Sequence, residues 1–460
     1  MTSDLLDSGM LAGLRSGLVG EAIGPGDAGY DGARAVFNGM VDRRPRVMAQ
    51  CVTPRDVATA VSFARSHGLE LSVRGGGHGV TGAAVVDDGL VVDLRRMNAV
   101  DVDPQAKIAR VGGGATMADL DRATQPHALA TTGGRASTTG VGGLTLGGGS
   151  GWLERRYGLM CDNLLAAELV TADGRRVRAS EQEHPELFWA LHGGGGNFGV
   201  VTEFTLGLHP LPAFSIALLL WPTEAGPEVI RRYRDYMDEA PDEVGGAVLY
   251  LTAPPEPFVP PELVGRQAVG MLLTYTGVLG QARPVFEPML GLGHAGEVVA
   301  ELPYADVQRM LDDPPGYRNY WSAEYLAGFP DQAADLFCAR ARDMVTPSPS
   351  QHVLFPLGGA VAAGRDDYPL PWRTASWAVH PFGLWEDRAD DERGRAWARA
   401  VRADLEPWSV GAVYLNFIGD EGADRTRAGL GERNTHRLAA VKAAYDPDDV
   451  FRASHPIARA

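Results

Sequence analysis

The sequence predicts an α+β fold with two domains, the first of which is completed by the C-terminal tail. At 460 residues, the chain exceeds the size that one hydrophobic core normally supports. Helix and strand patterns alternate over residues 53–208, whereas residues 212–411 combine strands with helices that would cover one face of a sheet. The tail is expected to pack back on the first domain. We therefore divide the chain into residues 1–210, 211–411 and 412–460.

Capping residues and turns predict the elements of the first domain. Thr53 can cap a helix whose first residue is Pro54, and Gly68 ends that helix. A short strand then leads into a run of glycines at residue 75. The other expected elements are strands at 89–94, at 101–111 with a break at Asp103–Pro104 and at 200–208, a hairpin at 168–179 turning at Asp173–Gly174, and helices at 116–123 and 184–191.

The middle region and the tail follow the same reasoning. The expected strands of the middle region span 214–221, 247–252, 268–276, 352–361 and 374–380, and its helices include 227–239 and 389–405. The proline-rich segment 254–261 is interpreted as a stiff connector rather than a site. In the tail, residues 411–421 are expected to form a buried strand, and residues 432–445 a helix that ends at Asp446–Pro447.

Charge and cysteine content narrow the class of protein. The net charge is −16, from 42 basic and 58 acidic residues, so a nucleic acid backbone would be repelled. Three widely spaced cysteines without a C-x-x-C pair support neither a disulfide framework nor a metal site, and they favour a reducing cytoplasm. No signal-peptide pattern and no run of 18 apolar residues is present, so neither secretion nor a membrane span is expected.

Glycine clusters mark the candidate site. Residues 75–79 read GGGHG directly after a strand, and backbone N–H groups without neighbouring side chains can approach a pyrophosphate closely. One such turn with a histidine is more often a surface loop. Three further clusters, at residues 138–143, 147–151 and 193–199, indicate a long ligand instead. The sequence has no Walker A motif, no G-x-G-x-x-G in a strand-helix unit and no complete nucleophile elbow.

Four segments together carry a resemblance to a known family. They are VRGGGHGVTG (73–82), TTGVGGLTLGGGSGWLERRYGLMCDNLLAAELVTADG (138–174), FWALHGGGGNFGVVTEF (188–204) and KAAYDPDDVF (442–451). The chain resembles the berberine-bridge-enzyme-like FAD-linked oxidases, which belong to the vanillyl-alcohol-oxidase type. The resemblance implies a two-lobed, discontinuous FAD-binding domain made of the N-terminal part and the tail. It also implies an inserted substrate domain, whose antiparallel sheet is covered by helices and roofs the isoalloxazine ring.

The resemblance assigns FAD to the glycine-rich segments. Arg74 to Gly77 would bind the pyrophosphate through backbone N–H groups, and His78 would be bonded to the flavin 8α-methyl carbon, to which a neutral imidazole nitrogen can add. The implied cofactor-binding residues are Arg74, Gly75, Gly76, Gly77, His78, Gly79, Thr138, Thr139, Gly140, Gly142, Gly143, Leu144, Asn197, Gly199, Val200 and Val201. Many relatives attach the flavin a second time through a cysteine, but Ala136 stands at that position. A single link through His78 is therefore expected, and Cys161 is interpreted as a buried thiol.

The same resemblance provides candidates for catalysis. Relatives carry Tyr-x-Asn-Tyr beside the reactive edge of the flavin, and this chain reads Tyr414-Leu415-Asn416-Phe417. Tyr414 is the candidate for deprotonating or orienting substrate, with Asn416 beside it. A phenol would need a lowered pKa to act as a base at neutral pH. The alternative is that Tyr414 is a packed aromatic residue on a buried strand.

The substrate site is less defined by the sequence. Tyr250, Phe355 and Trp377 are the candidate substrate-binding residues on the roof strands, with His380 considered beside them, and strand register decides which of them face the flavin. The aromatic and aliphatic candidates favour a bulky, neutral or weakly polar small molecule.

The leading hypothesis is an FAD-dependent oxidase that takes a hydride from a C–H bond of a secondary metabolite, such as a polyketide or a glycosylated antibiotic. O2 would reoxidise the flavin and give H2O2. The alternatives are a monooxygenase that remodels a polyketide-type substrate, a carbohydrate or alcohol oxidase, and a non-catalytic flavin-binding protein. A homodimer is expected by analogy with the family alone.

Overall fold

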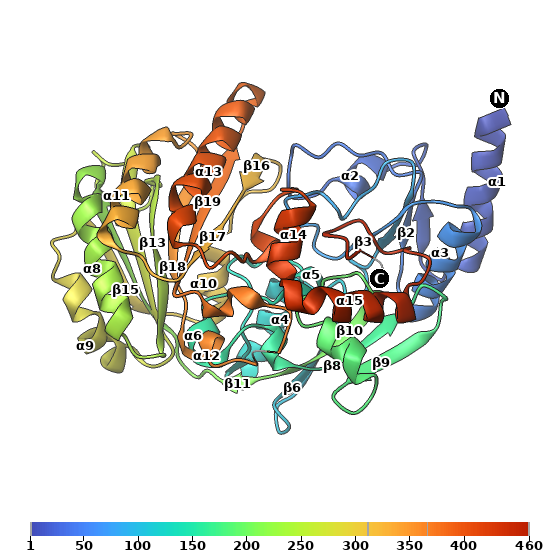
Figure 1. Cartoon of the computed structure of the whole chain (residues 1–460), viewed down its shortest axis with the longest axis horizontal. Helices are drawn as coiled ribbons and strands as arrows, with labels where there is room; N and C mark the ends of the chain where they lie inside the picture. The colour runs from blue at the N-terminus through green and yellow to red at the C-terminus, as the bar shows by residue number, and fades with distance from the viewer. Residues whose placement is uncertain (1, 311, 366, 459–460) are drawn as a thin grey trace.

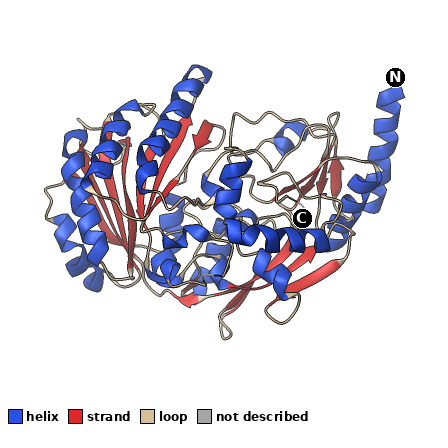
Figure 2. Cartoon of the chain, viewed as in Figure 1, coloured by secondary structure: helices blue, strands red, loops and turns tan. Residues whose placement is uncertain are grey.

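The computed structural model describes residues 2–310, 312–365 and 367–458 of the chain, which form two lobes side by side (Figure 1). One lobe contains one large sheet with a layer of helices, and the other contains smaller sheets and the C-terminal helices (Figure 2). No helix within these residues has the length and apolar character needed to cross a bilayer. The mixed α+β fold predicted from the sequence is confirmed.

A four-stranded sheet organises the start of the first lobe. Its strands lie in the order β1 (Glu21–Ile23), β2 (Val47–Gln50), β4 (Leu90–Asp93) and β3 (Leu71–Arg74), and β2, β4 and β3 are parallel. The connecting helix α3 (Pro54–Ser66) begins with the predicted cap, because Thr53 accepts from the Asp56 N–H and Asp56 accepts from the Thr53 N–H. Helices α1 (Thr2–Gly17) and α2 (Tyr30–Arg34) precede it along the chain.

A five-stranded antiparallel sheet completes this lobe. Its order is β5 (Val100–Asp103), β6 (Ile108–Gly112), β10 (Val200–Gly207), β8 (Leu164–Val170) and β9 (Arg176–Ser180). The predicted hairpin is present, since β8 pairs with β9 and Gly174 adopts a left-handed φ of 82° in the turn. The other elements are α4 (Met117–Thr124), α5 (Val141–Gly147), α6 (Glu154–Tyr157), α7 (Pro185–Ala190) and the small pair β7 (Leu129–Ala130) with β11 (His209–Pro210).

The second lobe is built on an antiparallel sheet of eight strands. Their order is β15-β12-β14-β13-β18-β19-β16, and β17 also pairs with β19. The strands are β12 (Ser215–Pro222), β13 (Val244–Thr252), β14 (Gln267–Tyr275), β15 (Gly296–Glu301), β16 (Arg318–Trp321), β17 (Glu324–Leu326), β18 (Gln351–Pro356) and β19 (Trp377–Trp385). Strand β18 ends earlier than predicted, because residues 359–362 form the short helix α12 (Gly359–Ala362).

Helices cover one face of this large sheet (Figure 2). They are α8 (Gly226–Glu239), α9 (Leu279–Leu290), α11 (Asp331–Arg340) and α13 (Asp391–Leu405), and their apolar side chains share one core with the sheet. Helix α10 (Tyr304–Met310) contacts α4 of the first lobe. The opposite face of the sheet is turned toward the first lobe. Because side chains alternate along each strand, every strand of this sheet contributes residues to both faces.

The tail does not contain the predicted strand. Over residues 411–421 the described structure has one short 3₁₀ turn (Leu415–Phe417) and no strand, although Val413 and Tyr414 are fully buried. A short apolar run requires burial but does not by itself specify a sheet partner. Helix α14 (Ala423–Leu430) follows, and the predicted helix α15 (Glu432–Tyr445) is confirmed.

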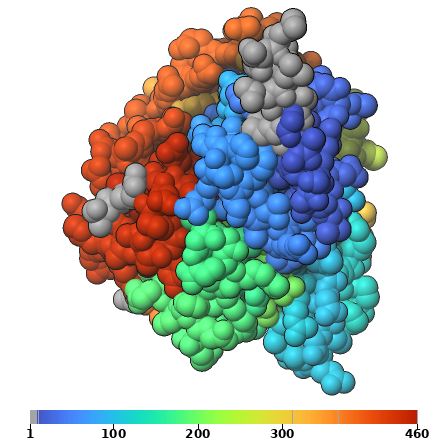
Figure 3. Space-filling model, turned by 90° about the vertical axis from the view of Figure 1, so that its right-hand side faces the viewer, coloured from blue at the N-terminus to red at the C-terminus, as the bar shows by residue number. Residues whose placement is uncertain are grey.

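The end of the tail is attached to the first lobe. The Lys442 ammonium is fully buried, and it donates to the backbone oxygens of Asn197 at 3.0 Å and Phe451 at 2.6 Å and to Asp446 Oδ2 at 2.6 Å. In the space-filling view, the C-terminal residues in red lie against the N-terminal residues in blue and green (Figure 3). We therefore propose that residues 1–210 and 412–460 form one lobe and that residues 211–411 form the other.

Candidate functional site

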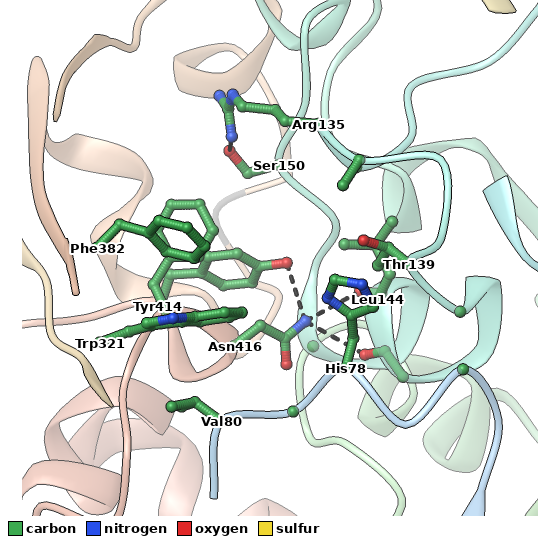
Figure 4. Close-up of a pocket in the computed structure, with 18 of the residues that line it drawn as sticks. His78, Val80, Arg135, Thr139, Leu144, Ser150, Trp321, Phe382, Tyr414 and Asn416 are labelled. Carbon is green, nitrogen blue, oxygen red and sulfur yellow. Dashed lines mark hydrogen bonds between the residues drawn. The ribbon is translucent and has the colours of Figure 1, made fainter. Parts of the chain in front are cut away.

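A cavity of about 750 Å³ lies between the two lobes. Its first wall comes from the glycine-rich segments, its second from the uncovered face of the large sheet, and its third from the tail. His78, Asn416 and the hydroxyl of Tyr414 lie close together in it, with Trp321 and Phe382 beside them (Figure 4). Most of the residues predicted to bind a cofactor are thus brought to one place.

Two glycine turns meet at the bottom of this cavity. A Cβ on Gly76 would collide with the backbone nitrogen of Gly140, and a Cβ on Gly140 would collide with that of Gly76. Gly77 also has a left-handed φ of 72°. The glycines therefore allow a close backbone approach that no other residue type permits.

The predicted cofactor-binding residues divide into two groups. Those that line the cavity are Gly75, Gly76, Gly77, His78, Gly79, Thr139, Gly140, Gly142, Gly143, Leu144, Asn197, Gly199, Val200 and Val201. Arg74 and Thr138 do not. The guanidinium of Arg74 points away and donates to the carbonyls of Ala33 and Ala35. Thr138 instead contacts His78 through its side chain.

His78 is held in a defined orientation. Its ring stacks on Phe37 with centroids 4.0 Å apart, and Nε2 lies 2.8 Å from Thr138 Oγ1. Burial lowers the pKa of His78 to about 4, so the imidazole is neutral at physiological pH. Among the described residues, none hydrogen-bonds Nδ1, which leaves this nitrogen free to act as a nucleophile.

Cysteine is absent from the cavity wall. Ala136 lines the cavity, whereas Cys51, Cys161 and Cys338, all within the described residues, do not. Cys161 is fully buried, and its burial raises the pKa of the thiol well above the usual range. The interpretation of Cys161 as a buried thiol is confirmed.

One wall of the cavity comes from residues of the tail that were not among the predicted cofactor-binding residues. Residues 451–455 line the cavity, and Asn197 connects to this segment because its amide nitrogen donates to the His455 carbonyl at 3.3 Å and its oxygen accepts from the Ile457 N–H at 3.2 Å. The family motif at residues 442–451, which ends where this segment begins, was the sequence signal that could have pointed to it. Asn197 therefore orders the loop as well as lining the cavity.

Tyr414 and Asn416 form one hydrogen-bonded unit. The Tyr414 hydroxyl oxygen accepts from the Gly149 N–H at 3.0 Å and from Asn416 Nδ2 at 2.9 Å. Asn416 Nδ2 also donates to the Gly143 carbonyl at 3.2 Å (Figure 4). Burial raises the pKa of Tyr414 to about 12, although these hydrogen bonds oppose the shift. The chain itself does not provide the lowered pKa that a tyrosinate base would need.

Strand register corrects part of the predicted substrate site. Phe355 lines the cavity, as expected. Tyr250 and Trp377 do not, because both point into the helix-covered core, where Trp377 packs against Tyr233 and Tyr250 packs against Phe337. On β19 the residues that face the cavity are His380 and Phe382. The prediction that Tyr250 and Trp377 bind substrate is therefore wrong, because both side chains point to the opposite face of the sheet.

Two further parts of the wall were not predicted. The guanidinium of Arg135 lies 4.0 Å from the centre of the Phe355 ring, and it pairs with the buried Glu154 at 2.6 Å and with Ser150 Oγ at 2.9 Å. Residues Pro254, Glu256 and Phe258 also line the cavity, so the segment 254–261 is not merely a connector. The lone arginine before Ala136 carried no motif that would have revealed it.

Comparison with known proteins identifies the family. A model described as an FAD binding domain matches residues 45–180, and one described as berberine and berberine like matches residues 413–458. The (R)-6-hydroxynicotine oxidase of Paenarthrobacter nicotinovorans is 32% identical over 95% of this chain and 96% of its own length. The chain belongs to the berberine-bridge-enzyme-like family of FAD-linked oxidases. It is an FAD-dependent oxidoreductase.

Solved structures of the family support the fold. The 6-hydroxy-D-nicotine oxidase of Arthrobacter nicotinovorans is 30% identical, with a TM-score of 0.84 over 96% of this chain and 98% of that one. A berberine-bridge-enzyme-like protein of Physcomitrella patens is 21% identical, with a TM-score of 0.86 over 99% and 100% of the two chains. The two-lobed architecture is thus a property of the family.

The residues of this berberine-bridge-enzyme-like chain fit FAD. A side-chain-free cradle formed by Gly76 and Gly140 suits a pyrophosphate, and a free imidazole nitrogen on His78 stands in the same cavity. The long cavity continues to residues 193–201 and to the tail. A dinucleotide can therefore extend along the first lobe while the large sheet stays available for a second ligand.

Gly76→Ala is expected to abolish FAD binding. The added methyl group must displace the backbone of Gly140, since no flexible side chain is present there to move. The measured quantity is the ratio of absorbance at the flavin maximum to that at 280 nm after purification. Gly32→Ala is the matched control, because a Cβ at Gly32 meets no atom within 4 Å and the residue lies outside the cavity. A flavin content in Gly76→Ala equal to that of Gly32→Ala would contradict the role of this contact.

Proposed function

We propose that this protein is an FAD-dependent oxidase of a bulky small molecule. The substrate would lose a hydride from a C–H bond and a proton from the adjoining O–H or N–H group, and O2 would take up both electrons and two protons to give H2O2. The observation that carries the proposal is the cavity itself. The glycine cradle and His78 form one side of the cavity, and aromatic side chains of the large sheet form the other. The cavity between them has a volume of about 750 Å³. A substrate would bind between the two.

FAD is proposed to be tethered through His78 alone. Gly75 to Gly77 and Gly140 would bind the pyrophosphate through the backbone, and Asn197 to Val201 would lie beside the adenine end. Bound FAD would supply a two-electron acceptor beside the substrate. The stacking of His78 on Phe37 and its contact with Thr138 hold the ring in one orientation, and burial keeps it neutral. Both features favour formation of a covalent bond by Nδ1.

Tyr414 is proposed to orient the substrate as a neutral phenol. Its oxygen already accepts two hydrogen bonds, and its own proton is retained because burial raises the pKa to about 12. The hydroxyl can therefore donate to a substrate oxygen or nitrogen near the flavin. Phe417, which replaces the second tyrosine of many relatives, stacks on His380 and leaves this part of the cavity less polar.

The proposed substrate class is a secondary metabolite such as a polyketide or a glycosylated antibiotic. The face of the large sheet that lines the cavity, called the roof below, is largely apolar and includes Leu218, Leu249, Leu272 and Phe355. The glycine-rich wall opposite has few side chains, which leaves room for a ring system. A carbohydrate or alcohol oxidase would be expected to place more hydrogen-bonding side chains on this face. The aliphatic roof residues therefore favour the bulky, weakly polar substrate.

Anaerobic reduction of the flavin tests this function. A panel of phenolic polyketides, glycosides and secondary alcohols is mixed with the holoprotein without O2, and bleaching of the flavin band identifies a substrate. Air is then admitted, and one H2O2 per product is expected. Incorporation of ¹⁸O from labelled O2 into the product would establish the monooxygenase alternative. A flavin that no compound bleaches, and that does not reoxidise after dithionite treatment, would favour a non-catalytic binding protein.

Tyr414→Phe is expected to lower kcat about 100-fold, because the substrate loses the hydrogen bond that positions it beside the flavin. The loss should be the same at every pH from 6 to 9, because the phenol of Tyr414, whose pKa is about 12, stays protonated across that range. Tyr250→Phe is the matched control, since Tyr250 is buried on the far face of the sheet and should leave kcat unchanged. A wild-type to Tyr414→Phe ratio that rises steeply with pH would mean that Tyr414 acts as an ionised base.

A further inference from the structure

His380 is the distinctive residue of the roof. Among the described residues of strands β12 to β19 that line the cavity, it is the one that carries a titratable side chain. The other residues of these strands that line the cavity are apolar, apart from Gln351 with its amide and Thr252 with its hydroxyl. A polar ring in such a wall, only 5% exposed, needs a partner for each nitrogen.

The protein fixes the orientation and the tautomer of this ring. His380 Nδ1 lies 2.8 Å from the carbonyl oxygen of Ser322, which accepts and cannot donate, so the proton resides on Nδ1. The ring stacks on Phe417 with centroids 4.2 Å apart and an interplanar angle of 11°, and the Trp321 ring lies nearly perpendicular to it, with centroids 6.0 Å apart. Nε2 is therefore an unprotonated acceptor that the ring contacts hold in a fixed direction.

His352 on the neighbouring strand shows what a purely structural histidine looks like in this sheet. Its Nε2 bonds to the Phe337 carbonyl at 3.1 Å, and its Nδ1 is sealed in the helix-covered core without a partner. His380 differs in two respects. It lies on the cavity face, and its second nitrogen is not among the sealed, unpartnered polar atoms of the described structure.

We infer that His380 Nε2 accepts a hydrogen bond from a hydroxyl group of the substrate and so selects substrates that carry an O–H donor on the side facing the roof. This inference rests on the proposed function, because it places the substrate between the roof and the glycine-rich wall. Tyr414 and His380 then have complementary roles, since Tyr414 retains a proton to donate and His380 offers a lone pair. The ring of Phe417 contacts both the His380 ring and the Tyr414 ring.

Binding of two matched aromatic probes tests the inference without turnover. The holoprotein is titrated with 2-naphthol and with 2-fluoronaphthalene, which has a similar shape and no O–H, and the flavin difference spectrum gives each Kd. His380→Phe should lower the affinity ratio of naphthol to fluoronaphthalene about fivefold to tenfold, the range expected for one hydrogen bond. His380→Gln, whose amide oxygen can accept, should recover part of the ratio. His352→Phe should not change it.

The outcomes separate the inference from the proposed function. An unchanged ratio in His380→Phe, or an equal loss in His352→Phe, overturns the role of His380, whatever the enzyme oxidises. If the ratio responds as expected in a protein that oxidises no compound of the panel, the proposed oxidase function fails while the hydroxyl-binding role of His380 stands.

Discussion

His78→Ala is expected to release all its flavin on acid precipitation, whereas the wild-type pellet stays yellow. The reason is that His78 presents a neutral, oriented imidazole in the cavity and that none of the three cysteines lines the same wall. Peptide mapping of the wild type by mass spectrometry should find the flavin mass on the peptide that contains His78. The variant protein can still bind FAD reversibly through the glycine cradle, so the supernatant is expected to be yellow.

His67→Ala provides the matched control for this experiment. His67 is exposed on the first lobe, where its ring stacks on Phe63 and its Nδ1 lies within hydrogen-bond distance of Ser66 Oγ and the Phe63 carbonyl. Its pellet should retain the colour of the wild type. A coloured pellet from His78→Ala would show a second attachment point, and a colourless wild-type pellet would show that no covalent link exists.

Lys442→Met is expected to destabilise the protein by about 3–5 kcal/mol, the cost of removing one partner from a buried ion pair. The substitution keeps the length of the side chain but leaves the Asp446 carboxylate, which is fully buried, without its cation. The carbonyls of Asn197 and Phe451 lose their donor at the same time. Because Asn197 and Phe451 line the cavity, FAD retention should fall together with the free energy of unfolding measured in urea.

Lys107 is the only other lysine in the chain, so Lys107→Met is the same substitution at an exposed site. It should change the free energy of unfolding by no more than about 0.5 kcal/mol. The double variant Lys442→Met with Asp446→Asn should recover part of the loss, since asparagine removes the uncompensated charge and its oxygen can still accept from the Phe451 N–H. Equal effects of the two lysine substitutions would contradict the role of the buried pair.

Local signals in the sequence were sufficient for several parts of the fold. The cap at Thr53, the turn at Asp173–Gly174 and the helix at 432–445 depend on residues within a few positions of each other, and all three are confirmed. The glycine turns at residues 75–79 and 138–143 also come together as expected. These turns could be predicted because the close backbone approach that a glycine permits depends on that residue alone and not on its distant neighbours.

The packing of segments that are far apart in the chain could not be predicted from the sequence in the same way. Tyr250 and Trp377 have the composition of a substrate site, yet they face the helix-covered core. The apolar run at 411–421 lacks any strand in the described structure, because Val413 and Tyr414 are buried by packing between the lobes rather than by a neighbouring strand. Arg135 gave no local signal because its partners, Glu154 and Phe355, are distant in sequence.

The sequence by itself determined the family, the cofactor and the glycine cradle with the adjacent histidine, because each depends on residue types at fixed short spacing. The tertiary structure decided which side of each roof strand faces the cavity, and it gave Tyr414 a raised pKa and His380 a free acceptor nitrogen. The physical reason is that strand register, burial and hydrogen-bond partners depend on which distant segments pack together. A shift of one residue along a strand moves a side chain from the substrate cavity to the core.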